Sequence, residues 1–272
     1  MPSQAPDRRQ PVALFGVRGR MGQSLVRALR ESPQLRLAAA VGAPDSSIVG
    51  RDAAVEGPAT GVLVGADVAL ALRDAAVALD FSTAEAVLAH AEACAAQGVP
   101  LLVGVTGLEA ATRRRLEAVS RQVAVLIAPN TSGGVALAIR FAALAARALG
   151  PDFDVEIAEA HHRLKRDAPS GTAIALGEAI AGARGRTLAE TAVHERHGDC
   201  GPRLPGSIGF AVVRAGDIVG EHTVLFAGDG ERLEITHRAA DRMIFARGAL
   251  RAAQWLAGRA PGLYGMADVI GH

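Results

Sequence analysis

The chain has 272 residues, half of them apolar but only 3% aromatic, so its core must be built mainly from Ala, Val, Leu and Ile. Its net charge is +1 with no long run of one sign. This balance argues against a nucleic-acid partner, because binding to a phosphate backbone usually requires a clustered basic excess.

Membrane insertion, secretion and a cysteine framework are not indicated either. The most apolar helical stretch, residues 133–150, contains two arginines and is short for a membrane span. Residues 1–11 contain two arginines but no long apolar stretch, which predicts a disordered tail and not a signal peptide. Cys94 and Cys200 lie far apart and outside any CxxC motif, so we expect two reduced thiols, no metal site and a cytoplasmic protein.

The first half of the chain alternates apolar strands with helices. Strands are predicted at residues 12–16, 35–41, 75–82, 100–107 and 123–130, and helices at residues 20–31, 85–98 and 109–122. Strands that are apolar throughout and are separated by helices predict a parallel sheet covered on both faces. This is the doubly wound α/β (Rossmann) architecture.

The pattern changes after Asn130. Helices are predicted at residues 135–149, 172–181 and 243–259, and alternating strands at residues 153–162, 207–216, 217–228 and 231–239. Glycine-containing turns join the last three strands, which predicts an antiparallel meander. We therefore expect a dinucleotide-binding domain of residues 1–132 and 241–272, and an α+β substrate domain with an open mixed sheet of residues 133–240.

Three glycines, Gly16, Gly19 and Gly22, follow the first strand with G-x-x-G-x-x-G spacing. Such glycines allow a tight turn and let backbone N–H groups approach a pyrophosphate at the positive end of a helix. A turn without a ligand would have the same spacing. Its position between the first strand and the first helix of a Rossmann pattern favours dinucleotide binding.

The end of the second strand lacks the acidic residue that usually binds the ribose hydroxyls of the cofactor. Gly42 and Ala43 occupy that place. Arg18 and Arg20 are candidates for an adenosine phosphate, although both would be equally suited to a solvated helix start. Turns at residues 80–82, 104–107 and 128–130 end three further strands, at the edge where ligands bind in open α/β sheets.

Residues 159–181 read EAHHRLKRDAPSGTAIALGEAIA and combine His161, His162 and Lys165 with a helix start. A His-His pair is more often incidental than catalytic. Here the backbone N–H groups of residues 170–172 are expected to point outwards and bind a carboxylate, with the hydroxyl of Thr172 as a further donor. An imidazole with a pKa near ~6.5 beside an ammonium group would serve proton transfer at neutral pH.

The run EAHHRLKRDAPSGTA, with GVRGRMG, DFS, GVTG, APN and the segment PGSIGFAVVRAGDIVGEHTVLFAGDGERLEITHRA, resembles the 4-hydroxy-tetrahydrodipicolinate (dihydrodipicolinate) reductase family. The resemblance extends from about Val12 to the C-terminus. It implies reduction of a small cyclic dicarboxylate by NADPH or NADH in diaminopimelate and lysine biosynthesis, and a homotetramer assembled through the second domain. Two positions depart from the family pattern: Gly42 replaces a frequent acidic residue, and Val105 replaces a threonine.

The resemblance also implies residue roles. His161 resembles the acid/base residue of the family and Lys165 its proton donor, although either one could protonate the substrate. The expected substrate contacts, which include the helix start, are His162, Lys165, Ser170, Gly171 and Thr172. The expected cofactor contacts, which include the glycine turn and the strand ends, are Gly16, Val17, Arg18, Gly19, Arg20, Met21, Gly22, Asp80, Gly104, Val105, Thr106, Ala128, Pro129, Asn130 and Thr131.

Two alternatives remain at this point. Another dehydrogenase of small acids or amino acids could have the same cofactor domain, but it would not require the His-His-x-x-Lys run beside an S-G-T helix start. A nucleotide-sensing protein without catalysis should have lost His161 or Lys165, and both residues are present.

Overall fold

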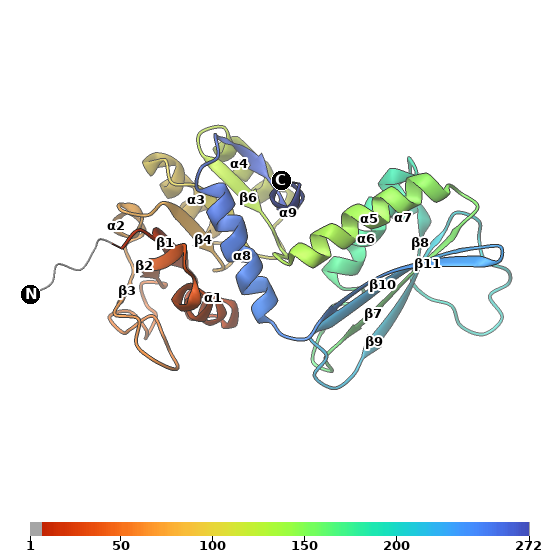
Figure 1. The fold of residues 1–272 in the computed structure, drawn as a ribbon, viewed down its shortest axis with the longest axis horizontal. Coiled ribbons are helices and arrows are strands. Elements are labelled where there is room, and N and C mark those ends of the chain that lie inside the picture. Colours follow the sequence, from red (N-terminus) through yellow and green to blue (C-terminus); the bar gives the residue numbers. More distant parts are fainter. Residues whose placement is uncertain (1–6, 272) are drawn as a thin grey trace, which may run out of the picture. The chain divides into compact units, whose positions relative to one another are not determined.

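The computed structural model describes residues 7–271, and the chain divides into two compact units (Figure 1). The first unit contains the chain up to Ser132 and again from Met243, and the second unit is Gly133–Arg242. The return to the first unit falls two residues after the start predicted from the sequence. Most of the predicted N-terminal tail, residues 1–6, lies outside the described part of the chain.

The first unit is built on a seven-stranded parallel sheet with the strand order β12-β6-β5-β4-β1-β2-β3. Its strands are β1 (Gln10–Phe15), β2 (Leu35–Val41), β3 (Val64–Gly65), β4 (Val77–Asp80), β5 (Leu101–Val103), β6 (Ala124–Ile127) and β12 (Gly262–Tyr264). Its helices are α1 (Arg20–Glu31), α2 (Val68–Leu72), α3 (Val87–Gln97), α4 (Ala110–Ser120), α8 (Met243–Leu256) and α9 (Met266–Ile270).

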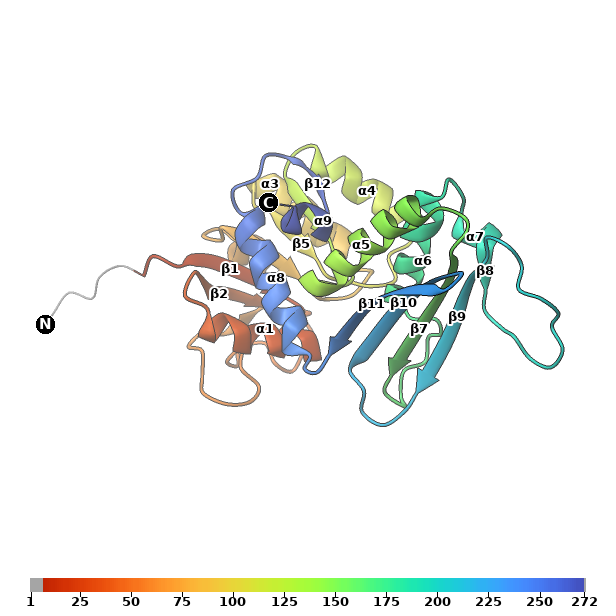
Figure 2. The same ribbon diagram turned by 45° about the vertical axis from the view of Figure 1, so that its right-hand side comes forward.

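Helices cover both faces of this sheet. Leu14, Leu79 and Leu126 on the central strands have no exposed surface. On one face, Val87 of α3 and Leu116 of α4 belong to a buried cluster with side chains of the central strands. Helices α1 and α8 contact each other on the opposite face, as the two views show (Figures 1 and 2). Continuously apolar strands can be buried only in this way, and the doubly wound prediction is confirmed.

The structure differs from the sequence prediction at the margins of the sheet. Strands β3 and β12 were not predicted, because segments of two or three residues are too short to show a period. Strand β1 begins at Gln10, whose N–H donates to the carbonyl of Gln34 at 2.7 Å. The predicted tail of residues 1–11 is therefore wrong at residues 10 and 11, which pair with β2.

The second unit contains a mixed five-stranded sheet with the order β11-β10-β7-β9-β8 (Figure 2). Its strands are β7 (Asp154–His161), β8 (Ala192–Val193), β9 (Ile208–Arg214), β10 (Gly220–Gly228) and β11 (Glu231–Ala239). Its helices are α5 (Gly133–Leu149), α6 (Gly171–Ala183) and α7 (Leu188–Thr191). Side chains of α5 and α6 form the core of this unit with alternate residues of β7, β9 and β10. Within residues 7–271, no helix combines the length and apolarity that a membrane span needs.

The predicted meander is wrong in its strand order. Strand β7 lies between β9 and β10, parallel to β9 and antiparallel to β10, so only β10 and β11 form a hairpin. The inward residues of β7 explain this position, because Val155, Ile157, Glu159 and His161 are all buried and need neighbouring strands on both sides. The connection from β9 to β10 passes the end of β7, where the N–H of Ala215 donates to the carbonyl of His161.

Candidate functional site

The glycine turn packs tightly between β1 and α1. Gly16 has φ +79°, and a Cβ atom there would lie 2.4 Å from the carbonyl oxygen of Phe81. A Cβ at Gly22 would lie 2.4 Å from the carbonyl oxygen of Gly16. Gly19 is the N-cap of α1, has no side chain to cap the helix, and is followed by no acidic residue in the first turn. The first N–H groups of α1 thus meet the requirements for binding a phosphate. This turn, residues 16–22, is named the glycine cradle.

The loops that end neighbouring strands are joined by backbone hydrogen bonds. The N–H of Phe81 donates to the carbonyl of Phe15 at 3.1 Å, that of Gly104 to Asp80 at 2.8 Å, and that of Ala128 to Val103 at 2.9 Å. A Cβ at Gly104 would lie 2.1 Å from the ring of Phe81, so any other residue there would have to displace this ring. The structure thereby brings the predicted cofactor segments together at one edge of the sheet.

Side chains in these loops differ in how accessible they are. The exposed side chains are those of Arg18, Arg20, Thr106 and Pro129, and those of Met21 and Asn130 are half-buried. Three others are buried, so these residues could contact a cofactor only through their backbone: Val17, Val105 and Ala128. Thr131 is buried, and its hydroxyl donates to the carbonyl of Phe245 on α8 at 2.6 Å.

Asp80 is fully buried at the end of β4. Its carboxylate accepts the N–H of Ser82 at 2.9 Å and the hydroxyl of Ser82 at 2.5 Å, and it lies 2.8 Å from Nδ1 of His90 on α3. These contacts hold the loop after β4, so the carboxylate of Asp80, a predicted cofactor contact, is buried and engaged within the protein. His90 was not predicted, because a single histidine in a helix gives no signal until the packing is known.

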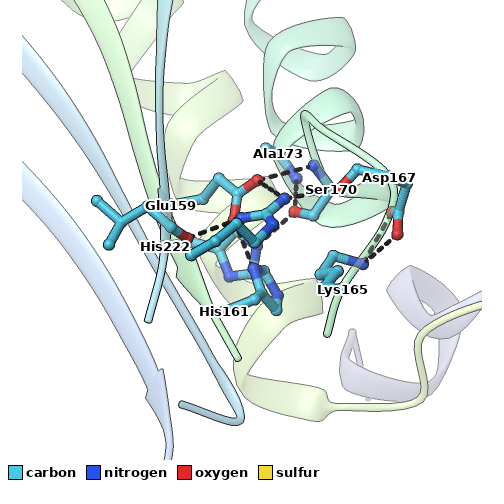
Figure 3. A network of polar contacts seen from close by, with 9 residues as sticks. Glu159, His161, Lys165, Asp167, Ser170, Ala173 and His222 are labelled. Atoms are coloured by element: carbon cyan, nitrogen blue, oxygen red, sulfur yellow. Dashed lines mark hydrogen bonds and ion pairs between the residues drawn. The ribbon is translucent and has the colours of Figure 1, made fainter. Parts of the chain in front are cut away.

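In the second unit, His161 belongs to a buried polar cluster (Figure 3). Its Nδ1 atom lies 2.5 Å from Oε2 of Glu159. Arg214 on β9 donates to both oxygens of that carboxylate, at 2.8 and 2.9 Å. Glu159 and His161 share one face of β7, since successive side chains of a strand alternate. Glu159 was not predicted as a site residue, although the alternation of β7 places it on the same face as His161.

Ser170 links this cluster to the start of α6. Its N–H donates to Oε1 of Glu159 at 3.1 Å, and its hydroxyl accepts the N–H of Ala173 at 3.2 Å as the helix cap. The same hydroxyl lies 2.8 Å from Nε2 of His222 on β10 (Figure 3). The N–H of Ser170 does not point outwards as predicted, because Glu159 accepts it. Gly171 is exposed and Thr172 is half-buried at the same helix start.

Lys165 lies in the loop between β7 and α6. Its ammonium nitrogen is 2.8 Å from both carboxylate oxygens of Asp167 (Figure 3). The backbone N–H of Lys165 donates to the carbonyl of His162. The side chain of His162, in the same loop, is half-buried. The ion pair lowers the pKa of Asp167, chiefly through the hydrogen bond from Lys165. Among residues 7–271 no group of three acidic, histidine or cysteine side chains is placed to hold a metal ion.

The environment of His161 favours the neutral imidazole. Burial lowers the pKa of His161 below its ordinary value of 6.5, outweighing the opposing effect of Glu159. The expectation of an unshifted pKa is therefore wrong. Burial opposes ionisation of Glu159, but hydrogen bonds from Arg214 and His161 lower its pKa overall. Burial and the neighbouring His161 lower the pKa of His222 to about 4.

The first unit is a Rossmann unit with a glycine cradle, and the second is a mixed-sheet unit with a buried histidine and carboxylate. This combination places the chain among two-domain pyridine-nucleotide oxidoreductases. Comparison with known proteins gives the family. Residues 10–131 match the model of the dihydrodipicolinate reductase N-terminus, and residues 134–270 match that of its C-terminus. The chain belongs to the dihydrodipicolinate reductase family.

Individual relatives agree with this assignment. The 4-hydroxy-tetrahydrodipicolinate reductase of Thiobacillus denitrificans is 52% identical over 261 residues, covering 96% of this chain and 98% of the relative. That of Alkalilimnicola ehrlichii is 51% identical over 262 residues, covering 96% and 98%. A solved structure, a dipicolinate-bound dihydrodipicolinate reductase from Paenisporosarcina sp. TG-14, has a TM-score of 0.78 at 26% identity and covers 96% of this chain and 99% of its own.

Proposed function

We propose that this chain reduces 4-hydroxy-tetrahydrodipicolinate to tetrahydrodipicolinate in lysine and diaminopimelate biosynthesis, using NADPH or NADH. The family match across both units is the observation that carries this proposal. An amino-acid dehydrogenase or a nucleotide sensor would not need the buried His161 cluster beside a cationic loop. The cellular location that fits this biosynthetic role is the cytoplasm.

The glycine cradle of the first unit fits the diphosphate of a pyridine nucleotide, because a Cβ at Gly16 or Gly22 would fill space that the backbone already occupies. When bound, the nicotinamide would supply a hydride to ring carbon 4 of the substrate, after or with loss of the 4-hydroxyl group as water. In our proposal the backbone of residues 16–22 holds the diphosphate. Loops 104–106 and 128–131 position the nicotinamide.

The second unit supplies the substrate contacts and the proton. Gly171 and Thr172 at the start of α6 bind one substrate carboxylate, and His162 lies near the other. Lys165 exchanges its partner Asp167 for the substrate, and Lys165 or His161 protonates the ring carbon next to the reduced one. Ser170 contributes indirectly in this scheme, because its N–H and hydroxyl are engaged by Glu159, Ala173 and His222.

The direct test is consumption of NADPH or NADH followed by absorbance. The substrate is supplied fresh from a dihydrodipicolinate synthase reaction. We expect turnover that depends on both the synthase product and this chain. The proposed function is wrong if adding this chain to the fresh synthase mixture causes no more cofactor oxidation than the mixture shows without it.

Cofactor choice is proposed as dual, with a modest preference for NADPH. Gly42 leaves no carboxylate to repel a 2′-phosphate, and Arg18 and Arg20 are exposed in the neighbouring turn. A Cβ at Gly42 would lie 3.3 Å from a methyl group of Val64, so a side chain there requires Val64 to move by a few tenths of an ångström.

We expect Gly42→Glu to shift the ratio of kcat/KM for NADPH over NADH towards NADH by about tenfold, equivalent to ~1.4 kcal/mol. The carboxylate would accept a hydrogen bond from the ribose and repel the phosphate. Gly42→Gln is the matched control, since it has the same size without the charge and should move the ratio much less. An unchanged ratio in Gly42→Glu would mean that another group reads the ribose.

A homotetramer assembled through the second unit is also proposed. Its sheet has one face packed against α5 and α6, while the other face exposes small or apolar side chains such as Ala158, Ala211 and Val213. Analytical ultracentrifugation should give about four times the chain mass. Replacing Val213 by aspartate should shift the distribution of oligomers towards smaller species. A wild-type chain that sediments as a monomer would contradict the proposal.

A further inference from the structure

We propose that Glu159, clamped by Arg214 and by the start of α6, is the positioning residue that orients His161 for proton exchange. This inference deepens the proposed function and rests on the assignment of His161 as an acid/base residue. Glu159 itself does not need to touch the substrate. Its contribution is to set which nitrogen of His161 carries the proton and where the ring points.

The hydrogen bonds of Glu159 leave its carboxylate no freedom to rotate. Oε1 accepts from Arg214 and from the N–H of Ser170, and Oε2 accepts from Arg214 and from His161. An ionised carboxylate offers about four acceptor positions, and all of them are used here. The side chain of Glu159 is fully buried, so water does not compete for these positions. The clamp joins β7, β9 and α6 at one carboxylate.

This clamp determines the tautomer of His161. A carboxylate can only accept, so Nδ1 of the neutral ring must carry the hydrogen, and Nε2 is left as the basic nitrogen. The space around Nε2 is kept open by Gly220 on β10, where a Cβ would lie 3.1 Å from that nitrogen. The ring of His222 stands edge-on to His161, with centroids 5.1 Å apart.

The charged and titratable groups around His161 come from each neighbouring element. They are Glu159 on β7, Lys165 in the following loop, Arg214 on β9 and His222 on β10. Burial lowers the pKa of His161, Glu159 raises it, and Lys165 and Arg214 lower it. Removing the charge of Glu159 must therefore lower the pKa of His161 further. Removing Arg214 must raise it while Glu159 remains ionised.

The experiment compares Glu159→Gln, Arg214→Gln and a matched control, Glu156→Gln. Glu156 lies on the opposite face of β7, where Arg196 holds it by two hydrogen bonds at 2.8 and 2.9 Å. The control thus removes a similar ion pair from the same strand without touching the His161 cluster. Nitrogen-15 NMR of histidine-labelled protein reports the tautomer and titration of His161, whose signal is assigned with His161→Asn.

We expect wild type and Glu156→Gln to show hydrogen on Nδ1 of His161. In Glu159→Gln the titration should move to lower pH and kcat should fall at least about tenfold, with the cofactor KM unchanged, since positioning is part of the general-acid contribution. In Arg214→Gln the titration should move to higher pH. Glu159→Asp, which keeps the charge, should recover part of the lost kcat.

A wild-type ring with hydrogen on Nε2 would overturn the proposal, as would an unchanged titration and kcat in Glu159→Gln. If Glu159→Gln does not fold, the direction of the shift in Arg214→Gln decides. The NMR measurements need no substrate, so they test the positioning role of Glu159 independently of the proposed reaction. A correct tautomer and correct shifts in a chain that does not turn over the substrate would refute the proposed function alone.

Discussion

Replacing Lys165 by alanine is expected to lower kcat by at least ~100-fold, the lower end of a general-acid contribution. The ammonium group is mostly buried and is held by Asp167 beside the start of α6, so its loss removes both a positive charge and a proton source. The dissociation constant of the cofactor should stay within about twofold in a fluorescence titration, because the phosphate cradle belongs to the other unit.

Two further variants separate charge from proton transfer at this position. Lys165→Arg keeps the positive charge but hardly releases a proton, so it should restore the substrate KM without restoring kcat. Arg166→Ala removes an exposed positive charge from the neighbouring residue and should leave kcat nearly unchanged. If cofactor affinity falls as much as kcat in Lys165→Ala, the proposed role of Lys165 is incorrect.

Gly22→Ala is expected to weaken cofactor binding by at least about tenfold and to lower the free energy of unfolding by ~1–3 kcal/mol, the usual cost of overpacking. The added Cβ would lie 2.4 Å from the carbonyl oxygen of Gly16 and 2.7 Å from that of Val17. Both obstacles are backbone atoms of the turn itself. The first turn of α1 would therefore have to move away from the phosphate site.

Gly182→Ala is the matched control for this prediction. Gly182 also lies within a helix, α6, but a Cβ there would meet no atom within 4 Å. Alanine is the better helix former by up to ~1 kcal/mol, so this variant should be as stable as the wild type or more stable. Urea denaturation of both variants tests the contrast. Equal stability of the two would mean that the turn relaxes and that close packing at Gly22 is not required.

Much of the first unit follows from local sequence signals. Helix α1 occupies Arg20–Glu31, the residues predicted from helical spacing, and β2 occupies Leu35–Val41 as predicted. Continuously apolar strands and glycine spacing are properties of short segments, and burial on both faces follows from them directly. The edge strands β3 and β12 could not be predicted, because their pairing depends on neighbours distant in sequence.

In the second unit, local sequence signals predict the strands but not the order in which they pair. Period-2 alternation correctly predicted β7, β9, β10 and β11 as strands, but it does not specify which strands pair. The meander was the simplest order for adjacent segments. The structure instead places β7 in the middle, because its inward polar and apolar side chains are all buried and require partners on both sides.

The site divides in the same way. The sequence by itself determined the family, the glycine turn and the His-His-x-x-Lys run, because each is a contiguous motif whose chemistry is local. Tertiary structure alone decided that Arg214, 55 residues beyond Glu159, clamps its carboxylate and that His222, 52 residues beyond Ser170, reaches its hydroxyl. The physical reason is that strand order brings these side chains together, and strand order depends on burying whole strands rather than on any short stretch of sequence.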